Sequence, residues 1–163
     1  MQTTMSAEIE RKFLVTTMPD LSGQEPLRYE RYYLNRSNTV EERVQKKGAA
    51  YEYEKKEKVS DLEHKKETRP ITREEFESLK PEAGEAIIRD GFMVSNNPDI
   101  TIKIYHGKYE GLVRAEVEFD SLESAEAFIP PTWMGKEITG TPLGKDSGLL
   151  DLSEEQFKEM LHS

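Results

Sequence analysis

Apolar and polar residues alternate in short runs along this chain, and the alternation predicts β-strands. Successive side chains of a strand point to opposite faces, so residues two apart share a face. Counting such runs between turn residues gives about eight extended segments. They span 6–15, 27–34, 38–47, 50–59, 62–69, 88–94, 99–106 and 111–120. Short turns, such as Gly48-Ala49, separate several of them and predict an antiparallel meander.

Three patterns typical of helix starts lie between and after these segments. Each is a Ser, Thr or Asp followed three residues later by Glu or Gln, which can form a capping box. The pairs are Thr72 with Glu75, Asp120 with Glu123, and Ser153 with Gln156. Pro81 and Pro130 end the first two helices, because proline cannot continue a helix. The apolar stripe of the last helix indicates core packing.

The first, seventh and eighth segments sort their side chains by chemistry. One face carries the apolar residues Ile9, Phe13, Val15, Ile100, Ile102, Ile104, Ala115, Val117 and Phe119. The other face carries Glu8, Glu10, Lys12, Thr101, Lys103, Arg114, Glu116 and Glu118. Eight antiparallel strands of this kind can form an open sheet with its charges in water. They can also close into a barrel with a charged interior and helices packed outside. The pattern allows both.

Composition narrows the classes of protein that fit. A length of 163 residues predicts one domain over 1–163. Hydrophobic residues make up 35% and charged residues 34%, a balance that a polar interior would explain. A net charge of −9 argues against nucleic acid or an anionic membrane as partner. The absence of cysteine excludes disulfides and thiolate chemistry. Without an apolar leader or membrane-spanning run, we expect a cytoplasmic protein.

The chain opens on Glu8-Ile9-Glu10-Arg11-Lys12, which places two carboxylates and an ammonium on one strand face. This face could hold a divalent cation beside an anion. With Glu8, Glu10 and Lys12 as its Glu-x-Glu-x-Lys signature, the chain resembles the CYTH domains, also called triphosphate tunnel metalloenzymes. The resemblance covers nearly the whole chain, and its start is similar to that of the short bacterial members. It includes Pro26-Leu27-Arg28, Arg43, Lys56, the run 115–119 and the run 127–139.

The resemblance implies an α+β fold, an eight-stranded antiparallel barrel with helices packed outside and a polar tunnel. It implies hydrolysis of inorganic or small organic triphosphate with Mg²⁺ or Mn²⁺, no nucleic-acid or membrane partner, and a homodimer as one arrangement. The implied catalytic residues are Lys12 and Lys56. The implied substrate ligands are Lys12, Arg43, Lys56, Arg89 and Lys145. The implied metal ligands are Glu8, Glu10, Glu116 and Glu118.

Several positions depart from the family pattern and predict weakened catalysis. The departures are Gln45 and Ile87 in place of basic residues, Lys103 in place of an acidic one, and Gly144 and Asp146 in place of tyrosine and asparagine. The fifth segment allows two registers, which align either His64, Lys66 and Thr68 or Lys65, Glu67 and Arg69 with the family's site positions. A catalytically silent scaffold that binds an anion or nothing is therefore an alternative hypothesis. Adenylate cyclase is a third, although no residue points to adenine recognition.

Overall fold

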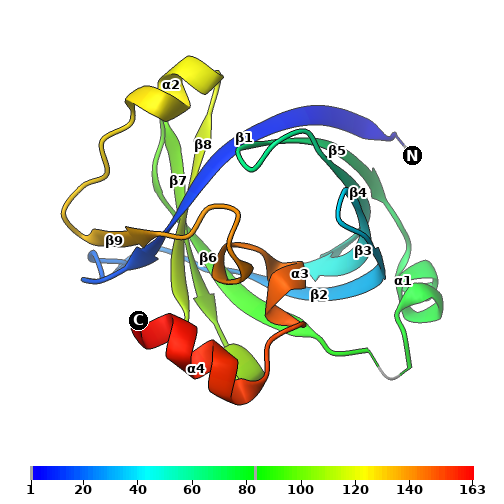
Figure 1. The fold of residues 1–163 in the computed structure, drawn as a ribbon. Helices are drawn as coiled ribbons and strands as arrows, with labels where there is room; N and C mark the ends of the chain where they lie inside the picture. Colours follow the sequence, from blue (N-terminus) through cyan, green and yellow to red (C-terminus); the bar gives the residue numbers. More distant parts are fainter. Residues whose placement is uncertain (1, 83) are drawn as a thin grey trace.

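The computed structural model describes residues 2–82 and 84–163, which are built around a closed antiparallel β-barrel (Figure 1). The strands are β1 Thr4–Val15, β2 Leu27–Arg36, β3 Val40–Lys47, β4 Ala50–Lys58, β5 Glu63–Pro70, β6 Ile87–Ser95, β7 Asp99–Tyr105, β8 Val113–Phe119 and β9 Met134–Glu137. Eight of them follow the order β5-β4-β3-β2-β6-β7-β8-β1, and pairing of β1 with β5 closes the ring. The predicted eight-stranded barrel is confirmed.

The meander prediction is correct for only part of the ring. Strands β2 to β5 pair in chain order, and so do β6 to β8. Strand β1 instead pairs with β5 through residues 4–9 and with β8 through residues 9–14, while β2 pairs with β6. One long strand thus joins two meanders into a closed barrel, which leaves no free edge among the eight. The short β9 extends the sheet beside the end of β1 and was not predicted.

The outer face of the barrel is apolar and is covered by helices, as the charge sorting predicts for a closed barrel. Helix α1, Arg73–Leu79, buries Phe76 against Tyr32 and Val44. Beside α2, Leu122–Ala127, Phe13 and Val117 form a second cluster. A third cluster lies on the cavity-facing side instead, because Ile87 pairs with Arg31 and Tyr105 with Arg89, both of which line the cavity. At one end of the barrel these two side chains pack with Phe157 of α4, Glu154–His162, and with Tyr109, Leu112, Ile138, Leu143 and Leu149. Burial of the first two clusters outside the barrel positions the charged residues of the same strands toward the interior.

The helix caps agree with the sequence in two cases of three. Both reciprocal bonds of the capping box are present at Thr72 and at Ser153. The predicted box at Asp120 is wrong by one residue, because Ser121 is the N-cap and its hydroxyl accepts from the Ser124 amide at 3.0 Å. A serine hydroxyl caps as well as a carboxylate does, so the pattern alone could not separate these neighbours. Among the described residues, no helix has the length and apolar character needed to cross a membrane.

Two short helical segments close one end of the barrel. The 3-10 helix η2, Pro142–Gly144, leads into α3, Asp146–Leu149, which Figure 1 shows at the barrel opening. A side chain at Gly144 would collide with the carbonyl oxygen of Ile138. This close approach leaves room only for a glycine at position 144. A further 3-10 helix, η1 Gly107–Tyr109, links β7 to β8.

Candidate active site

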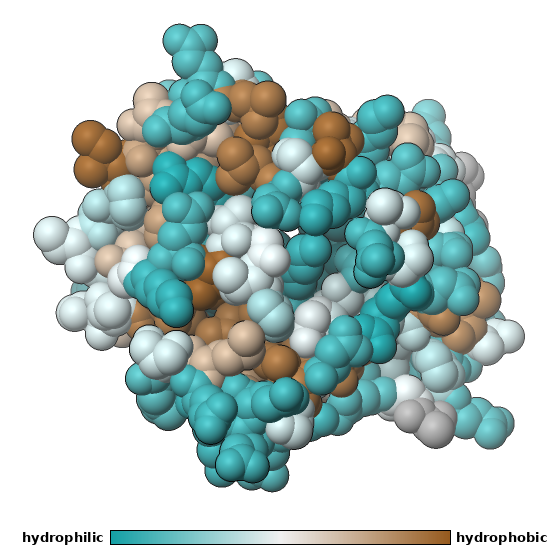
Figure 2. Space-filling view, in the orientation of Figure 1, coloured by the Kyte–Doolittle hydropathy of each residue, from teal (hydrophilic) through white to brown (hydrophobic). Residues whose placement is uncertain are grey.

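The barrel encloses a cavity of about 310 Å³, and Figure 2 shows a hollow ringed mainly by hydrophilic residues. Among the described residues, ten basic and seven acidic side chains line it. The basic residues are Lys12, Arg31, Arg43, Lys47, Lys56, Lys66, Arg89, Lys103, Arg114 and Lys145. The acidic residues are Glu8, Glu10, Glu41, Glu54, Glu116, Glu118 and Asp146. All nine residues that the resemblance implicates line this cavity, which carries excess positive charge inside an acidic protein.

The structure settles the register of β5. Glu8 of β1 lies opposite His64, and His64 and Lys66 both line the cavity. Burial and the nearby Lys56 and Lys12 lower the pKa of His64 to about 3, so this imidazole is neutral at physiological pH. Since the alternate residues of β5 point outward, this strand brings no carboxylate into the cavity.

Three carboxylates meet on one side of the cavity. Oxygen atoms of Glu8, Glu10 and Glu118 lie within 4.8 Å of one another, because Glu10 pairs with Glu118 across β1 and β8 and Glu8 is two residues along. Partial burial and the charges of Glu10 and Glu8 raise the pKa of Glu118. Carboxylate oxygens at this spacing fit a hard divalent cation such as Mg²⁺ or Mn²⁺, and a cation there would relieve their mutual repulsion.

Lysines from two strands face these carboxylates. The Nζ of Lys66 lies 2.6 Å from Glu8, and the Nζ of Lys56 lies 3.6 Å from Glu8 and 3.9 Å from Glu10. Burial opposes ionisation of Glu8, but Lys56 and Lys66 outweigh it and lower its pKa to about 2. On the same face of β1, Lys12 donates to the carbonyl of Gly144 at 2.9 Å. Burial, with the charges of Arg114 and Lys56, lowers the pKa of Lys12 to about 8.

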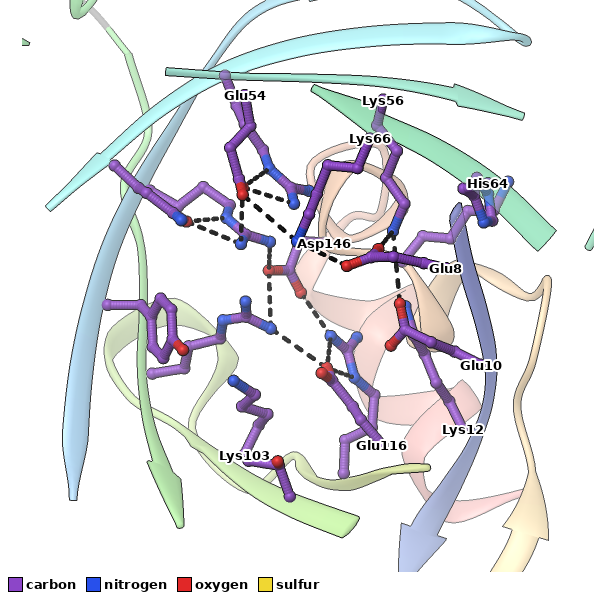
Figure 3. A pocket seen from close by; sticks show the side chains of 18 of the residues that line it. Glu8, Glu10, Lys12, Glu54, Lys56, His64, Lys66, Lys103, Glu116 and Asp146 are labelled. Carbon is purple, nitrogen blue, oxygen red and sulfur yellow. Dashed lines mark hydrogen bonds and ion pairs between the residues drawn. The ribbon is translucent and has the colours of Figure 1, made fainter. Parts of the chain in front are cut away.

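Asp146 lies at the centre of a buried network of arginines, between Glu54 and Glu116 in Figure 3. Its carboxylate oxygens lie 2.8 Å from Arg31, 2.9 Å from Arg114 and 3.3 Å from Arg89. Burial opposes its charge, but Arg89, Arg114 and Arg31 overcome that cost and hold the pKa of Asp146 well below its usual range. With an aspartate at position 146, where the family pattern has asparagine, three guanidinium groups share one negative charge.

Glu116 belongs to the same network. Its Oε2 lies 2.7 Å from Arg114 and 3.3 Å from Arg89. The cluster of three carboxylates does not include it. In this structure Glu116 therefore orients arginines, and the cluster that could hold a cation is formed by the other three predicted ligands.

Sequence analysis missed Glu54, the carboxylate that holds Arg43. The Nη2 of Arg43 lies 2.8 Å from Glu54, and Arg31 and Lys66 approach it to 3.8 and 3.5 Å. Glu54 is 3% exposed, which is rare for a carboxylate that lacks partners. A signal was present in the sequence, because Glu54 is two residues before Lys56 and must share its face.

Comparison with known proteins places this geometry in a family. The chain is 32% identical over 146 residues to an inorganic triphosphatase of Nitrosomonas europaea, and the match covers 87% of this chain and 95% of that protein. The chain belongs to the CYTH, or triphosphate tunnel, family. Membership in this family of metalloenzymes implies a divalent cation. No family model matches the sequence.

The solved structures agree with membership in the triphosphate tunnel family. The crystal structure of an inorganic triphosphatase matches with a TM-score of 0.60 and 29% identity, covering 87% of this chain and 93% of that chain. A conserved hypothetical protein from Pyrococcus furiosus matches with a TM-score of 0.55 and 17% identity, covering 91% and 93%. The second match shows the shared fold alone.

Proposed function

We propose that the protein hydrolyses inorganic triphosphate in the barrel cavity with the help of Mg²⁺ or Mn²⁺. The observation that carries the proposal is one cavity that combines a carboxylate cluster with an excess of basic side chains. A polyphosphate requires several cations around its oxygens, and a hard metal ion prefers carboxylate ligands. The 32% identical relative from Nitrosomonas europaea is an inorganic triphosphatase, which supports the same substrate class here.

Each group has a role in this proposal. Glu8, Glu10 and Glu118 would hold the cation, which would supply Lewis-acid stabilisation and lower the pKa of a bound water. Lys12 and Lys56 would neutralise charge on the transferred phosphoryl group, while Arg43, Arg89 and Lys145 would bind the remaining phosphate oxygens. The water oxygen forms a bond to the terminal phosphorus as the bridging P–O bond breaks, which yields phosphate and diphosphate.

A second function, anion binding with slow turnover, is favoured by the pairing of the arginines. Asp146, Glu54 and Glu116 already neutralise guanidinium groups that a substrate would otherwise engage. Catalysis depends on interactions that are stronger in the transition state than in the ground state. Arginines held by internal carboxylates cannot shift freely toward developing charge, so weakened hydrolysis is part of our proposal.

Phosphate release from tripolyphosphate, ATP and thiamine triphosphate, each with Mg²⁺, Mn²⁺ or a chelator, tests these proposals. We expect the highest rate with tripolyphosphate and none with the chelator. Tripolyphosphate binding without metal-dependent release would support the binding scaffold. Formation of cyclic AMP from ATP would support the adenylate cyclase alternative. Absence of both binding and release for all three compounds would contradict the proposed function.

A further inference from the structure

Basic side chains from three strands lie close to the ring of Tyr29 in the cavity wall. The ring centroid of Tyr29 lies 4.1 Å from the Nζ of Lys103, 4.9 Å from the Cζ of Arg89 and 5.9 Å from the Nζ of Lys47. All four residues line the cavity, and we call them the tyrosine subsite. The face of an aromatic ring attracts cations, but it supplies no negative charge to neutralise them.

Lys103 forms no ion pair with any carboxylate of the described residues. It is 6% exposed, and among residues 2–82 and 84–163 no carboxylate oxygen lies within 4.0 Å of its Nζ and no hydrogen bond is formed by it. In Figure 3 no dashed line reaches Lys103, whereas Lys56 and Lys66 both pair with Glu8. A buried ammonium without a partner is costly. An anion bound in the cavity beside Lys103 would therefore be stabilised by this ammonium.

Arg89 adds a second unmatched donor at the same place. Its Nη1 approaches Glu116 and Asp146, each at 3.3 Å, but its Nε is buried and has no hydrogen-bond partner in the described structure. Buried donors of this kind are rare unless a ligand or water completes them. Arg89 thus presents a buried unsatisfied donor beside Tyr29, and Lys103 adds an ammonium without an ion-pair partner among the described residues.

The backbone opposite Lys103 leaves room for its ammonium. Gly91 of β6 pairs with Lys103 of β7, and a Cβ at Gly91 would lie 3.2 Å from the Nζ of Lys103. Any larger residue would press on the ammonium. The glycine therefore lets Lys103 lie against the ring of Tyr29.

The charged groups around Lys103 come from four elements. Arg31 of β2 and Arg89 of β6 repel its positive charge, while Glu116 of β8 and Asp146 of α3 attract it. Arg114 of β8 lies directly opposite Lys103 in the sheet and adds a further positive charge. Burial is the largest effect, and with the arginines it lowers the pKa of Lys103 to about 7. Near neutral pH this lysine is therefore poised between its charged and neutral forms.

We propose that the tyrosine subsite binds phosphate oxygens of the triphosphate, and that Lys103 accepts a proton when the anion arrives. This inference rests on the proposed function and adds a substrate-binding residue to it. An anion beside Lys103 would favour its charged form and would also satisfy the Nε of Arg89. Proton uptake is the property that separates this role from a merely structural lysine.

Calorimetric titration of the full chain with tripolyphosphate, without metal, at about pH 8, in buffers of different ionisation enthalpy, tests the inference. Lys103→Met removes the charge and keeps the stem that packs on Tyr29. Lys65→Met is the matched control, because Lys65 is an exposed lysine on the outward face of β5, away from the cavity. Lys103→Gln serves as a second neutral variant, and thermal unfolding checks that each variant is folded.

We expect Lys103→Met to raise the Kd for tripolyphosphate by about tenfold to a hundredfold, the effect of losing a charged hydrogen bond. The wild type should also take up about one proton more per chain on binding than the variant does. The control should match the wild type in both. Equal affinity and equal proton uptake in wild type and both Lys103 variants would overturn this inference alone. Failure of the wild type to bind tripolyphosphate would overturn it together with the proposed function.

Discussion

Arg31 and Gln45 lie directly opposite each other on β2 and β3, and the Nε and Nη2 of Arg31 both donate to the Oε1 of Gln45, at 2.9 and 2.8 Å. The family pattern has an arginine at position 45. In this chain the neighbouring strand supplies a guanidinium instead, that of Arg31. The glutamine carbonyl orients it, and its Nη1 reaches Asp146 at 2.8 Å. The apparent loss of a basic residue at Gln45 is therefore offset by Arg31.

The first prediction follows from this exchange. Arg31→Gln should weaken tripolyphosphate binding about tenfold, because it removes a cavity guanidinium. The double variant Arg31→Gln, Gln45→Arg should recover most of the lost affinity, since the charge returns on the facing strand. Calorimetric titration measures both. If the double variant binds no better than the single one, Arg31 does not replace a guanidinium at position 45.

The second prediction concerns the carboxylate cluster. Glu8→Gln with Glu10→Gln should lower metal-dependent phosphate release by about a hundredfold, because two of three ligands lose their charge. Mn²⁺ titration should give about one ion per wild-type chain and much weaker binding in the double variant. Glu57→Gln is the control, because Glu57 is exposed and pairs in register with Lys65 on the outer face. Unchanged Mn²⁺ binding in the double variant would exclude this site.

The third prediction concerns stability in acid. The pKa values of Asp146 and Glu54 are lowered in the folded protein, so their ion pairs stabilise it above the ordinary carboxyl pKa. That contribution is lost as the pH falls below about 4, because protons then bind the unfolded state preferentially. The free energy of unfolding, from urea titrations at several pH values, should therefore decrease steeply over this range.

Asp146→Asn should reduce this acid sensitivity and cost about 3 kcal/mol at neutral pH, because three arginines lose a shared buried charge. Asp151→Asn is a matched control: Asp151 pairs with Arg36 at 3.0 Å but its side chain is 68% exposed. The control should change stability by less than about 1 kcal/mol. Equal destabilisation by both variants would show that the buried ion pairs of Asp146 add no more to the free energy of unfolding than an exposed pair does.

The fourth prediction concerns stability in alkali. The pKa of Lys103 is lowered to about 7 in the folded chain against an unfolded value of about 10.4. Between these values the unfolded state binds the extra proton, so the contribution of Lys103 to stability should rise with pH. Lys103→Met should be more stable than the wild type at about pH 7. Above that pH its free energy of unfolding should lack the increase that Lys103 contributes. A pH profile parallel to that of the wild type would contradict the burial of a titrating lysine.

Three predictions from the sequence concern the behaviour of the protein in solution and in the cell. They are the assignment of 1–163 to one domain, the homodimer and the cytoplasmic location. Each stays a prediction. Size-exclusion chromatography with light scattering would decide the oligomeric state, and limited proteolysis would decide whether the chain behaves as one cooperative unit.

The sequence alone determined which side chains share a strand face. Strand alternation is a local property of the backbone, so Glu8, Glu10 and Lys12 share one face wherever the strand lies. The caps at Thr72 and Ser153 are local for the same reason. The apolar faces and the signature together were enough to predict the barrel.

Only the tertiary structure decided which charges meet inside that barrel. Asp146 and Arg31 are 115 residues apart in the chain, and nothing in either segment specifies the other as its partner. The register of β5 depended on its pairing with β1, and a shift of one residue would have turned Lys66 outward. In the described part of the chain, Asp146 and Glu116 pair with arginines, and no carboxylate lies within ion-pair distance of Lys103. Ring closure brings these groups together, and closure depends on contacts between distant segments that no local pattern encodes.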